Sequence, residues 1–346
     1  MPSNRRNLLA SVGAEPIATL AVAHDTSPYV TAYPWFASGF GTKFSDPATI
    51  PTGNGNGVAF SPAGTEVAIA HNTSPFVSAY PWSGSGFGTK FSDPATLPAN
   101  GCFGVAFSEA GTTIALSHVA SPYIAAYPWS ASGFGTKYSN PATLPTYSGR
   151  GVAFSPASTE VAIAHDITPF VTAYPWSGSG FGTKFSDPAT LPTGIGYGVA
   201  FSPAGTEIAL SHDTSPYVTA YPWSASGFGT KFSDPATLPA GRGTGVDFSP
   251  DGTAIGVSSS ASPYILAYAW SASGFGTKFS NPATLPSNWC DDINFSDDGD
   301  YVAVAQLTAP RVGVYSWSAS GFGTRFSDPV TIPTGTGNGV AFSPTL

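Results

Sequence analysis

The fold of this chain is decided by residues 57–98, which read GVAFSPAGTEVAIAHNTSPFVSAYPWSGSGFGTKFSDPATLP. The tryptophan of this stretch belongs to a series of seven, spaced 47 residues apart with no insertion or deletion: Trp35, Trp82, Trp129, Trp176, Trp223, Trp270 and Trp317. A fixed period of about 20–50 residues is typical of chains built from one repeated supersecondary unit. We therefore expect a tandem array of a single 47-residue unit.

Each unit is predicted to form four short strands, at residues 57–61, 66–71, 76–82 and 87–97 of the quoted stretch. Turns rich in Pro and Gly separate the strands. The second strand is apolar at successive positions, which indicates burial on both faces. The fourth carries Lys90, Asp93 and Pro94, and charge with proline is typical of an outer edge strand.

Four short antiparallel strands do not fold alone, but units stacked radially bury their apolar faces against each other. The sequence therefore predicts an all-β, seven-bladed β-propeller with four antiparallel strands in each blade. We expect residues 17–346 to form this single domain, preceded by an N-terminal extension of residues 1–16.

The two ends of the chain predict how the ring closes. The repeat enters at its second strand, residues 17–24, and the missing first strand, GVAFSP, appears at residues 339–344. Blade 1 is therefore expected to take its inner strand from the C-terminus, which leaves no open sheet edge.

The motif Val-Ala-Phe-Ser-Pro followed by Asp-Gly-Thr resembles the WD-repeat propeller family, and its Phe-to-Thr part is complete as FSPDGT at residues 248–253. The resemblance covers residues 17–346 and implies the four-stranded blade. The chain departs from the family in two ways. It has Tyr80-Pro81 where the family has a Trp-Asp pair at the end of the third strand, and it lacks the family's Gly-His before the first strand.

Composition excludes several classes of partner. The net charge is −8, and the 12 Lys and Arg residues form no basic stripe, so nucleic acid is not an expected partner. No apolar run reaches the roughly 20 residues of a membrane helix, so no membrane insertion is expected. The apolar stretch after Arg5-Arg6 is too short for a signal peptide. The sequence assigns no compartment, and a cytoplasmic or virion protein fits equally.

The two cysteines, Cys102 and Cys290, share one repeat position four repeats apart, so we expect unpaired thiols. Ligands to one metal ion must converge, and equivalent residues of different blades do not. The acidic cluster at residues 291–300 matches no calcium-loop spacing. We therefore expect no metal and no cofactor.

The blades differ most in the loop between the fourth strand and the next first strand, where aromatic, charged and amide residues replace one another. Such residues dominate binding hot spots. The turn after the second strand is predicted to lie on the same face and carries all five histidines, which either cap that turn or contact a partner. The predicted partner-binding surface comprises Asn54, Asn56, Phe103, Arg150, Tyr197, Arg242, Trp289, Asp291, His24, His71, His118, His165 and His212.

No nucleophile elbow or phosphate-binding loop occurs in the sequence, and near-identical repeats offer few unique residues for a catalytic site. The sequence therefore predicts a protein that is not an enzyme, an interaction or structural module that binds a protein through the variable loops, such as a virus or phage particle component. The alternative is a multivalent lectin that binds glycans at the repeated Trp and Phe loops.

Overall fold

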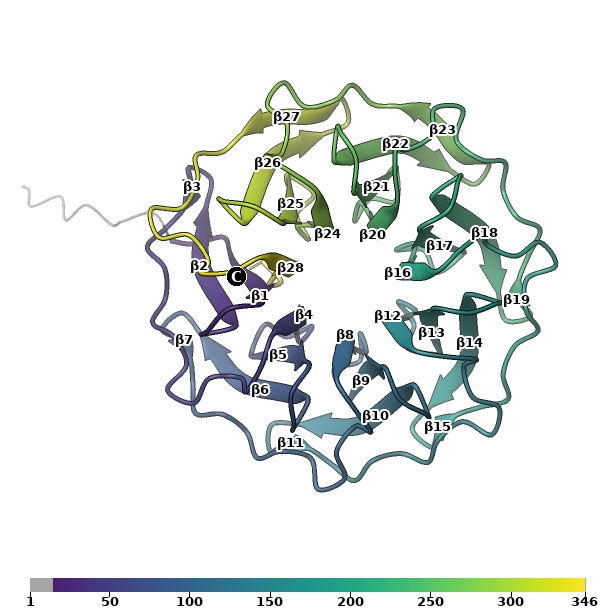
Figure 1. Ribbon diagram of the computed structural model, residues 1–346, viewed down its shortest axis with the longest axis horizontal. Coiled ribbons are helices and arrows are strands. Elements are labelled where there is room, and N and C mark those ends of the chain that lie inside the picture. Colours follow the sequence, from purple (N-terminus) through teal and green to yellow (C-terminus); the bar gives the residue numbers. More distant parts are fainter. Residues whose placement is uncertain (1–14, 346) are drawn as a thin grey trace, which may run out of the picture.

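The computed structural model describes residues 15–345 and shows a ring of seven four-stranded antiparallel sheets (Figure 1). This confirms the predicted all-β, seven-bladed propeller. Most of the predicted N-terminal extension, with Arg5-Arg6, lies outside the described residues. Within residues 15–345 no helix has the length and apolarity to span a membrane.

The four strands of a blade are called a to d from the channel outward. The inner a strands of blades 1 to 7 are β28 (Gly337–Phe342), β4 (Gly55–Phe60), β8 (Cys102–Phe107), β12 (Gly149–Phe154), β16 (Gly196–Phe201), β20 (Gly243–Phe248) and β24 (Cys290–Phe295). The b strands are β1 (Ala18–His24), β5 (Glu66–His71), β9 (Thr113–His118), β13 (Glu160–His165), β17 (Glu207–His212), β21 (Ala254–Ser259) and β25 (Tyr301–Gln306).

Outside these lie the c and d strands. The c strands are β2 (Val30–Phe36), β6 (Val77–Ser83), β10 (Ile124–Ser130), β14 (Val171–Ser177), β18 (Val218–Ser224), β22 (Ile265–Ser271) and β26 (Val312–Ser318). The d strands are β3 (Gly39–Phe40), β7 (Gly86–Phe87), β11 (Gly133–Phe134), β15 (Gly180–Phe181), β19 (Gly227–Phe228), β23 (Gly274–Lys278) and β27 (Gly321–Arg325).

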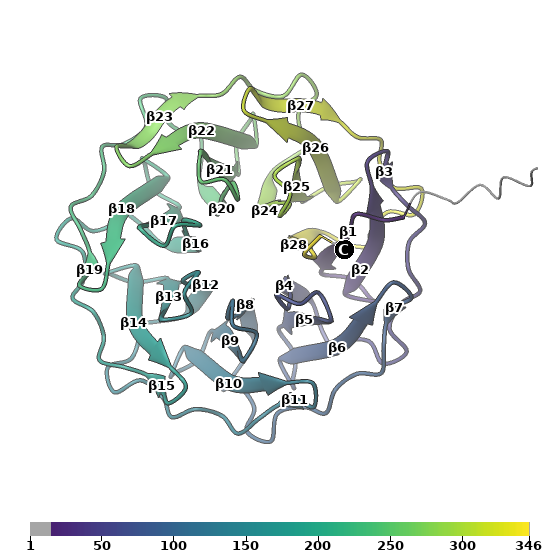
Figure 2. The same ribbon diagram turned by 180° about the vertical axis from the view of Figure 1, so that it is seen from behind.

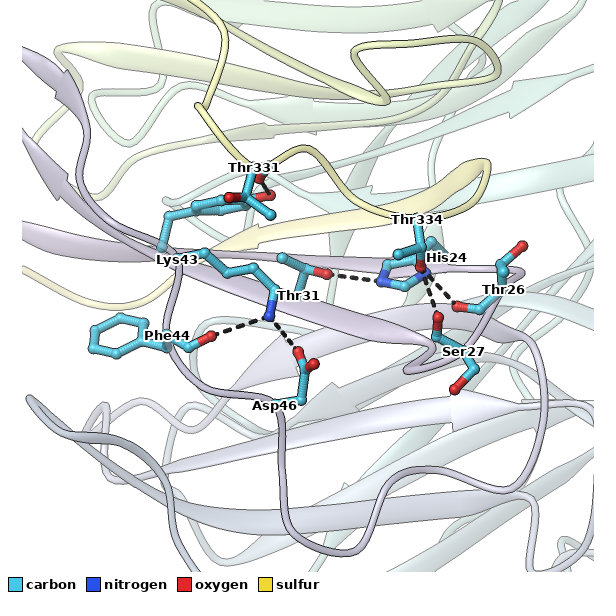
Figure 3. Close-up of polar contacts among 10 residues, drawn as sticks. His24, Thr26, Ser27, Thr31, Lys43, Phe44, Asp46, Thr331 and Thr334 are labelled. Carbon is cyan, nitrogen blue, oxygen red and sulfur yellow. Dashed lines mark hydrogen bonds and ion pairs between the residues drawn. The ribbon is translucent and has the colours of Figure 1, made fainter.

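The ring closes as the sequence predicts. β28 pairs antiparallel with β1, with Ala341 opposite Ala21, and completes the sheet order β28-β1-β2-β3. The C-terminal strand therefore lies beside the first strand of the chain (Figure 2). The loop that leads into β28 is also tied to blade 1, because the Thr334 hydroxyl donates to the carbonyls of Thr26 and Ser27 (Figure 3).

The d strands are shorter than predicted. In blades 1 to 5 each has two residues, and only β23 and β27 reach five. Beyond β7 the chain keeps only two backbone bonds to strand c, from Gly88 N to Pro81 O at 2.8 Å and from Phe91 N to Ala79 O at 2.9 Å. Pro94, which has no N–H, cannot extend the ladder. Lys90 pairs locally with Asp93, and the other blades repeat this contact on the rim (Lys43 and Asp46 in Figure 3).

The repeated tryptophans wedge adjacent blades together. Trp82 packs edge-to-face on Phe87 and Phe60 of its own blade and on Phe44 of the preceding blade, with ring centroids 4.8–5.5 Å apart. Such pairs add to the burial of apolar area. The seven indoles are at most 7% exposed, so they present no open stacking surface for a sugar. The two cysteines are buried and unpaired, as predicted.

Candidate functional site

Every inner strand contains a β-bulge at one end. The register of β4 against β5 shifts between Gly55 and Gly57, which leaves Asn56 without a partner on β5. Gly57 has no room for a side chain, because a Cβ would lie 2.7 Å from the Phe103 carbonyl oxygen. A bulge re-aims the side chain of its extra residue, and here those residues line one cavity. The bulged residues are Asn56, Phe103, Arg150, Tyr197, Thr244, Asp291 and Asn338.

This channel cavity lies among the inner strands, which surround the axis of the ring in Figure 1. Its volume is about 410 Å³, and Arg242 and Trp289 of the d–a loops complete its wall together with Asp292. The three amide and hydroxyl bulge residues reach across to the next blade: Asn56 donates to Cys102 O, Asn338 to Gly55 O and Thr244 to Cys290 O. These three residues connect the blades. The aromatic, arginine and aspartate side chains of the wall are the ones that could contact a ligand.

Aromatic rings and guanidinium groups alternate along one side of the cavity. Arg150 lies 5.0 Å from the ring centroids of both Phe103 and Tyr197. Arg242 follows, 5.1 Å from the Tyr197 ring and 4.4 Å from the Trp289 ring. The Arg242 side chain also donates to the Tyr197 hydroxyl at 2.8 Å. We call these five residues the cation–aromatic arc. Each stack holds a flexible arginine in place at the cavity wall.

Two carboxylates of β24 stand beside the arc. Burial, with the charge of Asp292, raises the pKa of Asp291 to about 6, and Arg242 partly offsets this rise. Burial also raises the pKa of Asp292 to about 6, although its carboxylate accepts hydrogen bonds from Val340 N and Ile293 N. Among residues 15–345 no side chain or amide donates to Asp291. Asp291 is therefore the cavity carboxylate that is available for proton transfer near neutral pH.

The structure brings together seven residues that the sequence predicted for a binding surface, namely the five of the arc, Asp291 and Asn56. Asn56 lies in the same wall but bonds to the next blade, and Asn54 is not part of the wall. Asp292 was missed as a lining residue. The sequence does distinguish this residue, because Asp292 stands where the other six repeats have glycine.

The five histidines are fully buried at the ends of their b strands and do not line the cavity. His24 contacts the Thr31 hydroxyl through Nε2 at 2.9 Å (Figure 3), and three others make the same contact with Ser78, Thr172 and Thr219. His118 lacks this contact, because Ala125 occupies the repeat position of the hydroxyl residue. Burial lowers the pKa of each imidazole to about 4.

Lowering the pH from about 6.5 to 4 is expected to destabilise the fold. The unfolded chain protonates its five histidines near pH 6.5, whereas the folded chain holds them neutral until about pH 4. Asp247, Asp291 and Asp292 oppose this loss, because burial raises their folded pKa values to about 7, 6 and 6, and burial also raises the pKa values of Glu109 and Asp297. Near pH 6 the five histidines and the three most shifted carboxylates give a net uptake of about two protons on unfolding, so the free energy of unfolding falls by up to about 2–3 kcal/mol per pH unit.

Urea unfolding at pH 7, 6 and 5 measures this slope. His165→Gln serves as the matched variant, because blade 7 already carries Gln306 at this position. The variant should show a shallower slope, by about one proton. A wild-type midpoint that rises between pH 7 and pH 5 would contradict the prediction.

No protein-family model and no curated protein sequence matches this chain. Solved structures do match it. A candidate 6-phosphogluconolactonase from Bacteroides fragilis superimposes with a TM-score of 0.75 at 14% identity, over 94% of this chain and 97% of its own. The periplasmic gluconolactonase PpgL of Pseudomonas aeruginosa gives a TM-score of 0.74 at 17% identity, over 95% and 99%. A candidate 6-phosphogluconolactonase from Bacteroides uniformis gives 0.72 at 15%, over 95% and 100%.

This comparison corrects the predicted function. The sequence predicted a non-enzymatic interaction or structural module, with a lectin as the alternative, but the structural neighbours named above carry lactonase names and not those of WD-repeat, virion or lectin proteins. These neighbours therefore contradict the prediction that the chain is not an enzyme. Binding of a separate protein or glycan partner stays a prediction. Identities of 14–17% establish the fold alone.

Proposed function

We propose that this protein hydrolyses the ring ester of a sugar-acid lactone in the channel cavity. The observation that carries the proposal is the placement of a free carboxylate, Asp291, and a guanidinium, Arg242, in one cavity of about 410 Å³ with aromatic walls. A sugar lactone fits such a cavity in size, and mixed polar and aromatic walls are typical of small-molecule sites. The names of the structural neighbours favour the same reaction.

Asp291 is the proposed general base. Its raised pKa, about 6, leaves it ionised at neutral pH but basic enough to take a proton from water. The water oxygen bonds to the lactone carbonyl carbon, and the carbon–oxygen ester bond of the ring then breaks. The ring oxygen leaves as a hydroxyl group with the proton that Asp291 took. The new carboxylic acid ionises and releases one proton to solvent, so a lactone and a water give an aldonate and a proton.

Arg242 is the proposed electrophilic group. Negative charge develops on the lactone carbonyl oxygen when water adds, and a fixed positive charge beside that oxygen stabilises the transition state. The Tyr197 and Trp289 rings cover the guanidinium, and the Tyr197 hydroxyl accepts from one of its terminal nitrogens. Arg242 is therefore held in place before substrate arrives and needs little reorganisation during the reaction.

Asp292 supports this arrangement from behind. Its carboxylate accepts from Val340 N at 3.0 Å, which fixes β24 against β28 at the closure of the ring. Its negative charge beside Asp291 raises the pKa of the base. Asp292 is thus a positioning residue that acts through Asp291.

The test is a lactonase assay with D-glucono-δ-lactone and 6-phosphoglucono-δ-lactone, in which acid release is measured above the spontaneous rate. We expect saturable hydrolysis of at least one lactone. Arg242→Asn should weaken it about 10- to 100-fold, the usual effect of losing hydrogen bonds to a charged group. Asn54 stands at this position in blade 2, so the variant suits the fold. Lys90→Asn, which removes the same charge on the rim, is the control. Hydrolysis at the spontaneous rate with both lactones would overturn the proposal.

A further inference from the structure

The two guanidinium groups of the arc differ in how far protein groups already occupy their hydrogen-bond donors. Arg150 donates to the Asp166 carboxylate from Nε at 2.5 Å and from a terminal nitrogen at 3.3 Å, and it also stacks on the Phe103 and Tyr197 rings. Arg242 donates to the Tyr197 hydroxyl, and within residues 15–345 its other nitrogens meet no carboxylate. The wall therefore presents one guanidinium that is neutralised by protein and one that is open to a ligand.

Asp166 makes a contact that its counterparts do not. Asp25 and Asp213 hold the same repeat position, and each accepts from a backbone amide of the adjoining d–a loop, Thr336 N at 2.9 Å and Ile195 N at 3.0 Å. Each also accepts from the hydroxyl of the threonine that follows it. Asp166 is followed by Ile167, which has no hydroxyl, and its carboxylate binds Arg150 instead.

The charges around the cavity disfavour a phosphorylated ligand. Arg150 and Arg242 supply two positive charges, whereas Asp166, Asp291 and Asp292 supply three negative charges once all are ionised. A phosphate monoester carries close to two negative charges at neutral pH, and it enters a cavity whose net charge is already negative. An uncharged lactone meets no such repulsion.

We propose that Asp166 makes the cavity select an uncharged sugar lactone over its phosphorylated counterpart, because it occupies the edge of Arg150 that would otherwise bind the phosphate. This inference rests on the proposed lactone hydrolysis and names the substrate class of that site. Asp166 does not touch the substrate. It determines specificity because it occupies the Arg150 nitrogens that could otherwise bind a phosphate in a bidentate manner, the geometry best suited to that group.

Asp166→Asn tests the inference, and Asp213→Asn is its matched control. Both variants remove one negative charge from the same turn in adjacent blades, but only the first releases an arginine. Blade 2 carries Asn72 at this position, so asparagine suits the turn. We expect the wild type to prefer D-glucono-δ-lactone over 6-phosphoglucono-δ-lactone in kcat/KM. Asp166→Asn should lower KM for the phosphorylated lactone and so reduce the ratio of the two kcat/KM values about 10-fold or more. Asp213→Asn should leave this ratio unchanged.

Binding of 6-phosphogluconate, measured by calorimetry, gives a readout that needs no turnover. Asp166→Asn should bind it about 10-fold more tightly than the wild type or Asp213→Asn. Adding Arg150→Asn should abolish the gain, and Asn56 and Asn338 show that the bulge accepts asparagine. Equal ratios and equal affinities in Asp166→Asn and Asp213→Asn overturn the inference but leave the lactonase intact. Absence of turnover in the wild type and every variant overturns the proposed lactone hydrolysis. The calorimetry then still decides whether Asp166 prevents Arg150 from binding a phosphate.

Discussion

Asp291→Asn is expected to lower kcat for lactone hydrolysis about 100- to 10,000-fold, the range by which general base catalysis contributes to rate. The amide cannot take a proton from water, while its size and hydrogen-bonding surface stay close to those of the carboxylate. Asparagine already stands at the equivalent bulge in Asn56 and Asn338, where it bridges to the next blade. The substitution therefore tests the chemistry of the cavity and not the fold.

The pH dependence of kcat/KM checks the same assignment. In the wild type kcat/KM should rise through pH 6 and level off above it, because Asp291, with a pKa of about 6, must be ionised to act. The variant should lose this inflection, once spontaneous hydrolysis is subtracted. Asp300→Asn is the control, since it removes a charge from an exposed a–b turn of the same blade. Activity of Asp291→Asn equal to that control would exclude Asp291 as the base.

The fold could be predicted from the sequence because its main determinant is periodic. The tryptophan spacing fixed seven units, and the displaced first strand at residues 339–344 located the closure. The d strands were overestimated because strand-forming residues continue past Phe87, whereas only contact with strand c makes them a strand. After Phe87 the regular ladder stops and only Gly88 N and Phe91 N still bond to strand c, which composition alone does not reveal.

The candidate site was located from the sequence but misinterpreted. Near-identical repeats made the variable positions conspicuous, and Phe103, Arg150, Tyr197, Arg242 and Trp289 were selected for that reason. No catalytic motif lies within any single stretch of the chain, so the sequence alone did not indicate chemistry at these positions. The cavity wall combines bulged residues of the inner strands with the d–a loop residues Arg242 and Trp289, so the residues that line it come from different blades and share no local sequence pattern.

Two features of the site depend on contacts that sequence position does not encode. Asp166 looks equivalent to Asp25 and Asp213 in the repeat, and only the structure shows its carboxylate bound to Arg150. The histidines were placed on the exposed turn because the b strand ends there. In the structure the burial of both faces of the strand extends through its last residue, so the imidazoles are enclosed.

Removal of residues 339–346 is expected to have the largest effect on stability. Val340 and Phe342 are almost fully buried and pack in one cluster with Trp35 and Tyr301. Their loss costs about 1.5–3 kcal/mol for each side chain, with a further penalty for the cavity left behind. β1 also becomes an unpaired edge, and the bond from Phe342 N to the Asn294 side chain disappears. The sum, about 5 kcal/mol or more, approaches the whole stability of many folded proteins.

Thermal unfolding followed by circular dichroism should show a fall in Tm of about 10 °C or more. Removal of residues 345–346 alone is the control, because it leaves β28 complete, and its Tm should stay within a few degrees of the full chain. A synthetic peptide of residues 337–346 should restore part of the lost stability, since β1 offers it a free edge with a fixed register. Hydrogen exchange should localise the damage, with β1 losing protection while β13, on the opposite side of the ring in Figure 1, keeps it. An unchanged melting curve would mean that the C-terminal strand does not hold the ring closed.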